Sequence, residues 1–275
     1  LGQNGIKHKW NAYFSYFDTK IAILKSAHIG NVQDLLRAIE SSVPLIINPY
    51  KSDIDYPMQD NSHCTANIEY TNANIADGEL HVKYSWQRNN RKEFDIRRGE
   101  FKDKPSLNME LSTHNLLSNY EWSTSLGNFD SGVFLQVQDN YSNPETGIKR
   151  LIPDYLKTKL GGYFKAAFNN TKDFIFEFGA RYEYHNNEVQ KFYTNKRWNL
   201  KNYEGPFRRY IIRETVSNKL VKRTLEFSTF SFNAGVRHSI SPTYTVNLNY
   251  SQTQRAPNIA EMFSDGLHHS LASIE

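Results

Sequence analysis

The feature that most constrains this chain is an alternation of apolar and polar side chains that recurs along it. Between residues 174 and 184 the even positions carry Phe, Phe, Phe, Ala, Tyr and Tyr, whereas the odd positions carry Ile, Glu, Gly, Arg and Glu. A period of two places successive side chains on opposite faces of a β-strand. Similar or weaker patterns predict nine strands in all, at 10–16, 68–70, 80–86, 120–126, 133–137, 160–168, 174–184, 230–236 and 244–250. The sequence therefore predicts an all-β fold.

The connections between these strands alternate in length. Long connections are expected at about 25–61, 93–107, 142–156 and 195–223. Short ones are expected at 73–78, 126–129, 170–173 and 241–243. In an antiparallel up-and-down sheet, successive connections lie at opposite ends, so every short turn falls on one rim and every long loop on the other. Because outer-membrane barrels have this asymmetry, the pattern predicts a transmembrane β-barrel wall.

A soluble β-sandwich or jelly roll is the main alternative architecture. It also alternates apolar and polar positions, because one face of each sheet is buried. A sandwich, however, gives no reason for short and long connections to alternate. In addition, the strand-like pattern at 174–192 is longer than the ~9–11 residues with which a β-strand spans a bilayer. Both features favour the barrel.

The same register predicts which side chains face lipid. Phe174, Phe176 and Phe178 are expected to face lipid, whereas Glu177 and Arg181 are expected to face the lumen. The opposite register would expose unpaired charge to hydrocarbon. Amphipathic rings near the ends of the apolar faces are typical of an aromatic girdle. These rings are Trp86, Trp122, Tyr182, Tyr184 and Tyr250.

Charge and composition exclude several classes of protein. The 33 basic and 29 acidic side chains leave a net charge of +4, which gives no electrostatic case for nucleic-acid binding. No stretch approaches the ~18 apolar residues that a membrane helix needs, so a helical membrane protein is excluded. The single cysteine, Cys64, excludes an internal disulfide and a cysteine-based zinc cluster.

The first long connection is predicted to contain a helix. Asn31 can cap it, and Asp34 lies in its first turn. Apolar residues recur at helical spacing from Val32 to Val43, before Pro44 ends the run. We therefore expect this loop to be structured.

The segment Arg255-Ala256-Pro257-Asn258, followed by Glu261-Met262-Phe263, resembles the arginine-alanine-proline box of TonB-dependent outer-membrane receptors. Three further segments look like parts of receptors of this family, at 17–35, 84–99 and 146–155. Together the similar segments run from about residue 10 to the end of the chain.

The resemblance implies a partial barrel, because the general form of such receptors is a ~22-stranded barrel with a plugged lumen. We expect residues 1–275 to be an interior part of the barrel domain, without its plug domain, its TonB-coupling segment and its C-terminal strands. The implied function is active transport in the outer membrane of a Gram-negative bacterium, where extracellular loops bind a scarce nutrient such as a ferric siderophore or haem. The implied partners are outer-membrane lipid and lipopolysaccharide, the TonB energy-transducing protein and a small-molecule cargo. No enzymatic activity and no resident cofactor are expected.

Histidines are the candidate metal ligands. The resemblance places His268 and His269 after the arginine-alanine-proline box, where haem receptors of the family carry a histidine. A neutral imidazole suits haem iron and zinc equally well, so a zinc receptor of the same family stays open. His28, in the loop that resembles the family, is a further candidate. A polar loop with no ligand role is the alternative for all three residues.

Two basic clusters in long connections are candidates for binding an anion. The first contains Arg97 and Arg98 with Lys102 and Lys104. The second consists of Arg208, Arg209, Arg213, Lys219, Lys222 and Arg223. Both could attract anionic ferric chelates or lipopolysaccharide phosphates. Solvated loops without a ligand are the alternative, because acidic neighbours partly neutralise both clusters.

Two other classes of function are open. An outer-membrane barrel enzyme would need a pair of side chains that activates water, and His185 with Glu188 is the only tempting pair. These residues are three positions apart on a predicted strand, hence on opposite faces. A soluble β-rich adhesin or carbohydrate-binding module would dissolve without detergent, so a solubility test separates it from a receptor.

Overall fold

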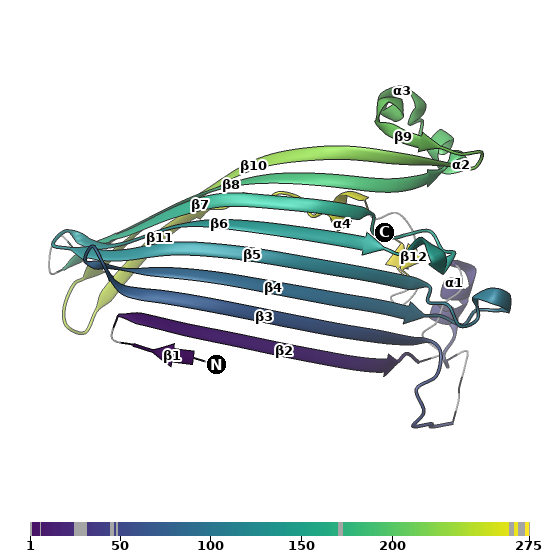
Figure 1. The fold of residues 1–275 in the computed structure, drawn as a ribbon, viewed down its shortest axis with the longest axis horizontal. Helices are drawn as coiled ribbons and strands as arrows, with labels where there is room; N and C mark the ends of the chain where they lie inside the picture. Colours follow the sequence, from purple (N-terminus) through teal and green to yellow (C-terminus); the bar gives the residue numbers. More distant parts are fainter. Residues whose placement is uncertain are drawn as a thin grey trace.

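The computed structural model describes residues 2–5, 7–24, 32–44, 47, 49–169, 173–263, 267–268 and 273–274. Within them, one 11-stranded antiparallel sheet dominates the fold (Figure 1). Its strands are β1 (Gly2–Asn4), β2 (His8–Ala22), β3 (Met58–Ile75), β4 (Gly78–Phe94), β5 (Leu107–Thr124), β6 (Gly127–Ser142), β7 (Asp154–Phe168), β8 (Phe174–Thr194), β9 (Ile211–Glu214), β10 (Asn218–Ser239) and β11 (Thr245–Gln252). The predicted all-β, up-and-down architecture is confirmed.

Nine of these strands coincide with the nine predicted ones, and most are longer than predicted. The short strands β1 and β9 were not predicted; β1 pairs with β2, and β9 pairs with β10. Short turns at 76–77, 125–126, 169–173 and 240–244 alternate with long connections at 23–57, 95–106, 143–153 and 195–217. The short turns lie on one rim and the long connections on the other, which we call the short-turn rim and the long-loop rim (Figure 1). The predicted asymmetry is therefore confirmed.

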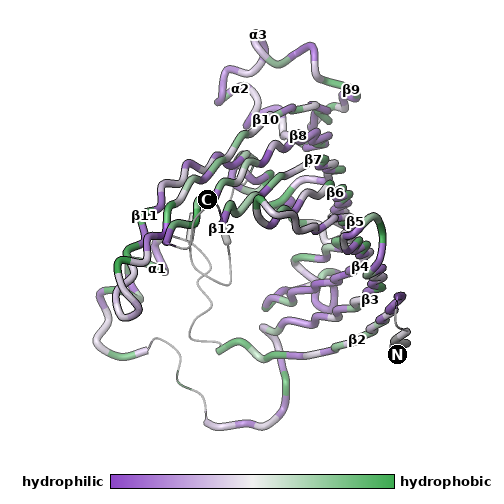
Figure 2. Tube along the Cα trace, turned by 90° about the vertical axis from the view of Figure 1, so that its left-hand side faces the viewer, coloured by the Kyte–Doolittle hydropathy of each residue, from purple (hydrophilic) through white to green (hydrophobic). Residues whose placement is uncertain are grey.

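The sheet is an open arc rather than a closed barrel. Its strand order runs from β1 to β11 with no pairing between the two ends, among the residues that the structure describes. Figure 2 shows the strands following a curve, with β12 on its concave side. The prediction that nine strands leave two unpaired edges is confirmed.

The pairing register sorts the side chains onto two faces of the arc. Glu183 lies opposite Gly161 and Thr229, whereas Tyr184 lies opposite Leu160 and Ser228. Odd and even positions of β8 therefore lie on opposite faces. The odd residues Arg181, Glu183 and His185 line a cavity together with residues of 253–258, so the odd positions belong to the concave, inner face and the even ones to the convex, outer face. The predicted division is confirmed, because the three phenylalanines share the outer face while Glu177 and Arg181 share the inner one. On the outer face, Phe176 and Phe178 are 48% and 42% exposed.

The turn between β3 and β4 shows how local sequence sets the register. Ala76 and Asp77 have φ angles of 46° and 63°. Two consecutive residues with positive φ are what a two-residue hairpin turn of type I′ requires, and this turn matches the twist of the flanking strands. The register shifts once, between Ile75 and Asn72, and the pairing then continues without further shifts from Asn72 and Leu80 to Met58 and Phe94.

The α-helices of the described residues lie outside the large sheet. They are α1 (Val32–Glu40), α2 (Asn195–Leu200), α3 (Glu204–Phe207) and α4 (Ile259–Phe263). The predicted helix in the first long connection is confirmed, but Val43 lies outside it. There the Ser41 hydroxyl donates to the Val43 carbonyl at 2.6 Å, a local bond that competes with helix continuation. The proposed cap, Asn31, lies outside the described residues. None of the described helices is long and apolar enough to cross a membrane.

Candidate functional site

The inner face of the sheet carries a cavity of about 1030 Å³, the inner cavity, between β5 and β11 and the segment 253–258. Charged side chains on its walls are mostly cationic. Five cations and one carboxylate line it: Lys157, Lys159, Lys165, Arg181, Arg255 and Glu183. A concave site lined mainly by charges of one sign concentrates their electrostatic field. The inner cavity therefore favours anions.

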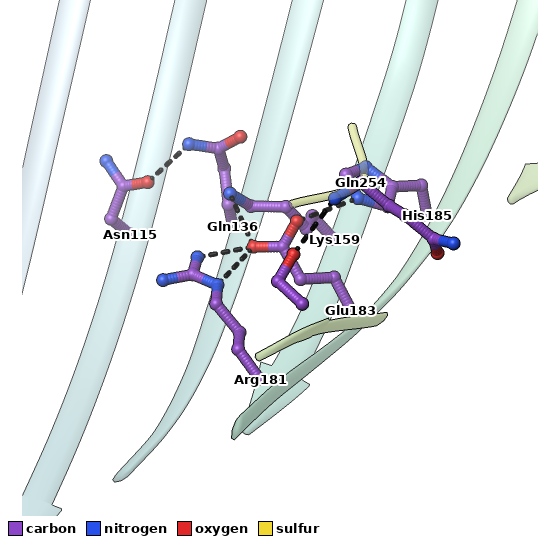
Figure 3. Close-up of polar contacts among 8 residues, drawn as sticks. Asn115, Gln136, Lys159, Arg181, Glu183, His185 and Gln254 are labelled. Carbon is purple, nitrogen blue, oxygen red and sulfur yellow. Dashed lines mark hydrogen bonds and ion pairs between the residues drawn. The ribbon is translucent and has the colours of Figure 1, made fainter. Parts of the chain in front are cut away.

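Glu183 is the centre of a polar cluster on this wall (Figure 3). Its Oε1 accepts a hydrogen bond from Arg181 Nε at 2.8 Å and lies 3.8 Å from Lys159 Nζ. Its Oε2 lies 3.2 Å from His185 Nε2. Lys159 comes from β7 and the other three residues from β8, so the cluster depends on the pairing that sets Lys159 opposite His185. One carboxylate thus orients two cations and an imidazole toward the cavity.

One aromatic ring contacts both cations of this cluster. The Phe134 ring has Arg181 Cζ 4.4 Å and Lys159 Nζ 5.2 Å from its centroid, in cation–π geometry. The ring fits because Gly161 has no side chain, since a Cβ there would lie 2.3 Å from Phe134 Cζ. On the neighbouring strands Gln136 Nε2 donates to Asn115 Oδ1 at 2.7 Å, which continues the polar wall (Figure 3).

A second cavity of about 210 Å³, the aromatic pocket, lies on the inner face near the long-loop rim. Its walls come from β8, β10, the connection 195–217 and α4, and include Tyr193, Trp198, Tyr203, Phe207, Arg223 and Phe263. The guanidinium carbon of Arg223 lies 5.3 Å from the Phe207 centroid and 5.0 Å from that of Tyr210. Its Nε is buried and has no hydrogen-bond partner among the described residues. This arrangement combines aromatic surface with an unsatisfied cationic donor.

The connection 195–217 is folded around Trp198, whose side chain is fully buried. Thr194 caps α2 by accepting a hydrogen bond from Arg197 N at 3.2 Å. The Trp198 indole then donates to Glu204 Oε2 at 2.7 Å, and this bond lowers the pKa of Glu204 below its usual value. The loop therefore forms its own small core, together with Tyr193 and Val221, on the end of the sheet.

The segment 253–258 borders the inner cavity, and α4, which follows it, borders the aromatic pocket. Arg255 donates to Glu261 with both terminal guanidinium nitrogens, and Asn258 N donates to the same carboxylate at 2.7 Å. Lys191, on the inner face of β8, donates to the Phe263 carbonyl. The segment that resembles the arginine-alanine-proline box is thereby attached to the wall between the two cavities.

Arg97 and Arg98 have different surroundings. Arg97 Nη1 donates to the Thr146 carbonyl at 2.7 Å, and its guanidinium carbon lies 4.8 Å from the Phe101 centroid. Arg97 therefore holds together two loops of the long-loop rim, 95–106 and 143–153. Arg98 is exposed. Neither arginine is among the residues that line the inner cavity or the aromatic pocket. Their role in binding an anion stays a prediction.

The second basic cluster is dispersed, and only Arg223 of its six residues lines the aromatic pocket. Arg208 pairs with Glu204, and Lys219 pairs with Glu214. Lys222 pairs with Glu188 at 2.7 Å on the outer face. That pair also shows that Glu188 faces away from His185, as expected.

The histidine candidates are only partly described. His28 and His269 lie outside the described residues. His268 belongs to β12 (Leu267–His268), which pairs with β13 (Ser273–Ile274) in a separate two-stranded sheet. No group of three or more His, Cys, Asp or Glu side chains in the described ranges could hold a metal ion. Metal binding by His268 and His269 stays a prediction.

Most residues of the two cavities were not singled out from the sequence. The alternation around 174–184 placed Arg181 on the inner face, but Lys159 and His185 join Glu183 only through strand pairing. Likewise, Trp198, Tyr203 and Phe207 form a pocket only once their connection has folded against β8 and β10. The sequence signal that could have predicted this pocket is the occurrence of these three aromatic residues within ten positions of one long connection.

Comparisons with known proteins agree with the β-barrel architecture described above. Residues 9–274 match a family model described as TonB dependent receptor-like, beta-barrel. Comparison with curated protein sequences gives no match. Among solved structures, the open form of the ferric-catecholate import receptor Fiu from Escherichia coli K12 has a TM-score of 0.63 at 13% identity, over 92% of this chain and 45% of that one.

Two further receptors have similar folds. The siderophore receptor PiuA from Acinetobacter baumannii has a TM-score of 0.55 at 9% identity, over 94% of this chain and 41% of that one. The Serratia marcescens hemophore receptor HasR, solved with its hemophore HasA and heme, has a TM-score of 0.50 at 13% identity, over 78% and 33%. The chain thus spans less than half of each. The family and its structural neighbours are transport receptors and not enzymes. The chain belongs to the TonB-dependent receptor-like β-barrel family.

Proposed function

We propose that this chain is part of the barrel wall of a receptor in the outer membrane of a Gram-negative bacterium. We further propose that the receptor takes up an anionic iron chelate, a ferric siderophore or haem, with energy delivered by TonB. Residues 1–275 would form an interior part of the barrel domain, whose open edges are completed by further strands. The lumen would be the inner face and the extracellular side the long-loop rim.

The outer face supports the membrane orientation. On β8 its apolar side chains run from Phe174 to Tyr184, ten residues apart, and are followed by Asn186 and Glu188. Ten steps of ~3.3 Å, in a strand tilted by about 40°, correspond to a height of about 25 Å. Because outer-membrane barrels have an outward apolar band of about this height, the short-turn half of the wall fits the hydrocarbon layer.

The aromatic pocket carries the proposal for the cargo. Burying a cationic donor without a partner costs free energy, and Arg223 Nε is such a donor. An anionic ligand would supply the missing acceptor. A cavity of about 210 Å³ has room for an aromatic ring, since cavities of ~150 Å³ hold benzene. An aromatic anion such as an iron-bound catecholate therefore fits the pocket chemically, and the cationic inner cavity gives it a path.

The test is binding of a ferric catecholate complex to the purified full-length receptor, measured by quenching of tryptophan fluorescence. Arg223→Gln should raise Kd by roughly tenfold or more, because a charged hydrogen bond is lost. Lys222→Gln is the matched control, since it removes one cation from the adjacent position on the outer face. Equal affinity of the two variants would contradict the proposed cargo site.

A second hypothesis is that His268 and His269, which are adjacent in sequence, ligate the metal of the cargo directly, either the iron of haem or zinc. Replacing both with Ala removes two imidazole donors and should raise the Kd of haem or zinc strongly if they are ligands. Unchanged binding of both, together with salt-sensitive binding of the ferric chelate, would reject the histidine hypothesis and leave the transport proposal in place.

A further inference from the structure

One segment, residues 253–263, borders both cavities of the inner face, and we call it the strap. Its first residues, among them Gln254, line the inner cavity together with His185 (Figure 3). Its last residue, Phe263, lines the aromatic pocket together with Lys191. The strap therefore runs along the inner face of β8 from one cavity to the other. A cargo that passes from the aromatic pocket to the inner cavity must displace it.

The part of β8 that lies between the two cavities is polar. Asn187 follows His185 and precedes Val189 on the inner face, and it is 1% exposed. Ile259, in the middle of the strap, is 2% exposed. His185 Nδ1 and Asn187 Oδ1 are buried and have no hydrogen-bond partner in the part of the chain that the structure describes. Burying such atoms costs free energy, and water would remove this cost when the strap leaves.

Lys191 connects the cargo pocket with the end of the strap. Its side chain is 5% exposed, lines the aromatic pocket and donates to the Phe263 carbonyl. A carbonyl is neutral, so an anion that enters the pocket attracts the ammonium more strongly than the carbonyl does. The difference is large where water is excluded, because the effective dielectric constant is low there. An anionic cargo thus competes with the strap for Lys191.

We propose that Lys191 is a second cargo-binding residue and that its transfer from the Phe263 carbonyl to the cargo anion releases the strap. This inference rests on the proposed cargo site at Arg223, whose guanidinium lines the same pocket. The bidentate pair of Arg255 and Glu261 is internal to the strap, so the released segment moves as one unit. Its release joins the aromatic pocket to the inner cavity only after cargo has bound.

The test measures amide hydrogen exchange at 258–263 in the full-length receptor, with and without a saturating ferric catecholate complex. The complex should speed this exchange by roughly threefold or more, because a five-residue helix is not stable once it leaves the sheet. Lys191→Met keeps the aliphatic chain and removes the ammonium. This variant should exchange fast without the complex and show no further increase with it. Lys222→Met, the matched control on the outer face, should respond as the wild type does.

A second measurement follows the polar surface beneath the strap. In Asn187→Cys/Cys64→Ser, a water-soluble maleimide should react at position 187 roughly fivefold faster when the complex is bound, because the strap no longer covers this position. A lysine that only braces the strap would leave both rates unchanged by the cargo. The Kd of Lys191→Met for the complex should rise by roughly threefold or more, because the contact with the anion is stronger than the carbonyl contact that it replaces.

The outcomes separate this inference from the cargo proposal. The Kd of the wild type is measured on the same preparations by quenching of tryptophan fluorescence. Binding of the complex without faster exchange at 258–263 would overturn the release of the strap and leave the cargo proposal standing. A wild type that does not bind the complex would overturn the cargo proposal and this inference with it. An exchange response or a Kd in Lys191→Met equal to that of the wild type would remove Lys191 from the role assigned to it.

Discussion

Arg255, which precedes α4, forms a bidentate ion pair with Glu261 inside it, with nitrogen to oxygen distances of 2.9 and 3.0 Å. The pair closes a loop of seven residues, in which Asn258 N also donates to the Glu261 carboxylate. Arg255, three residues beyond the end of β11, therefore fixes the start of α4, and α4 in turn contributes Phe263 to the aromatic pocket. The segment 253–263 acts as one unit that joins the inner cavity to the aromatic pocket.

The first prediction concerns this unit. Arg255→Gln removes both charged hydrogen bonds, so amide hydrogen exchange at 258–263 should become faster. Hydrogen exchange with mass spectrometry on the full-length receptor measures this directly. Arg213→Gln, which removes an exposed cation from β9, should leave exchange at 258–263 unchanged. Equal protection in the two variants would show that the ion pair does not hold α4.

The second prediction tests the orientation of β8. Phe176→Arg places a charge on the outer face within the apolar band and should destabilise the folded receptor by about 2–4 kcal/mol if the site lies near the bilayer midplane. Glu177→Arg, at the next position, places the same arginine on the inner face, where a charged residue already lies. It should cost much less. Urea titrations of folding into lipid vesicles give both values. Similar losses for the two variants would contradict the lipid-facing assignment.

The third prediction concerns two adjacent glycines of β7. A Cβ at Gly161 would lie 2.3 Å from Phe134 Cζ and 2.6 Å from the Tyr182 carbonyl oxygen, whereas one at Gly162 would lie 3.4 Å from the nearest atom. Gly161→Ala should therefore destabilise the receptor by roughly 1–3 kcal/mol through overpacking. Gly162→Ala should be close to neutral. The same vesicle titrations compare them, and adding Phe134→Leu should recover part of the loss at Gly161.

The wall was predictable from sequence because its signal is local. Alternation at 174–184 requires no partner strand to be known, and the division of Phe176 from Glu177 follows from it. The cavities were less predictable, since they depend on pairing and on loop folding. Lys159 meets Glu183 only because β7 and β8 pair in one register, and Trp198 is buried only because its connection turns back on β8. The short strand β9, which lies in the same connection, pairs with β10. Its four residues do not alternate between apolar and polar, so the sequence pattern did not predict it.

The fourth prediction concerns acid. The hydrogen bond from Trp198 lowers the pKa of Glu204, so the ionised carboxylate stabilises the folded connection 195–217 above the usual carboxylate pKa. That contribution is lost as pH falls through the lowered pKa. Trp198 emission should then shift to longer wavelength, isolated by subtracting the spectrum of Trp198→Phe. Glu204→Gln should abolish this acid transition, and Glu214→Gln, in the same connection but away from the indole, should retain it.

The last prediction separates two adjacent arginines that the sequence grouped as one anion-binding cluster. Arg97 bonds to the Thr146 carbonyl and packs on Phe101, so Arg97→Glu should loosen the contact between 95–106 and 143–153 and speed proteolysis there. Arg98 is exposed, so Arg98→Glu should leave proteolysis unchanged and act only on charged ligands. If Arg98 attracts an anionic chelate, its charge reversal should slow association, and the difference from wild type should vanish at high salt because exposed charges are then screened. Stopped-flow association rates at low and high ionic strength measure this. An unchanged rate at low salt would remove Arg98 from the cargo path and leave Arg223 as the arginine to which binding is assigned.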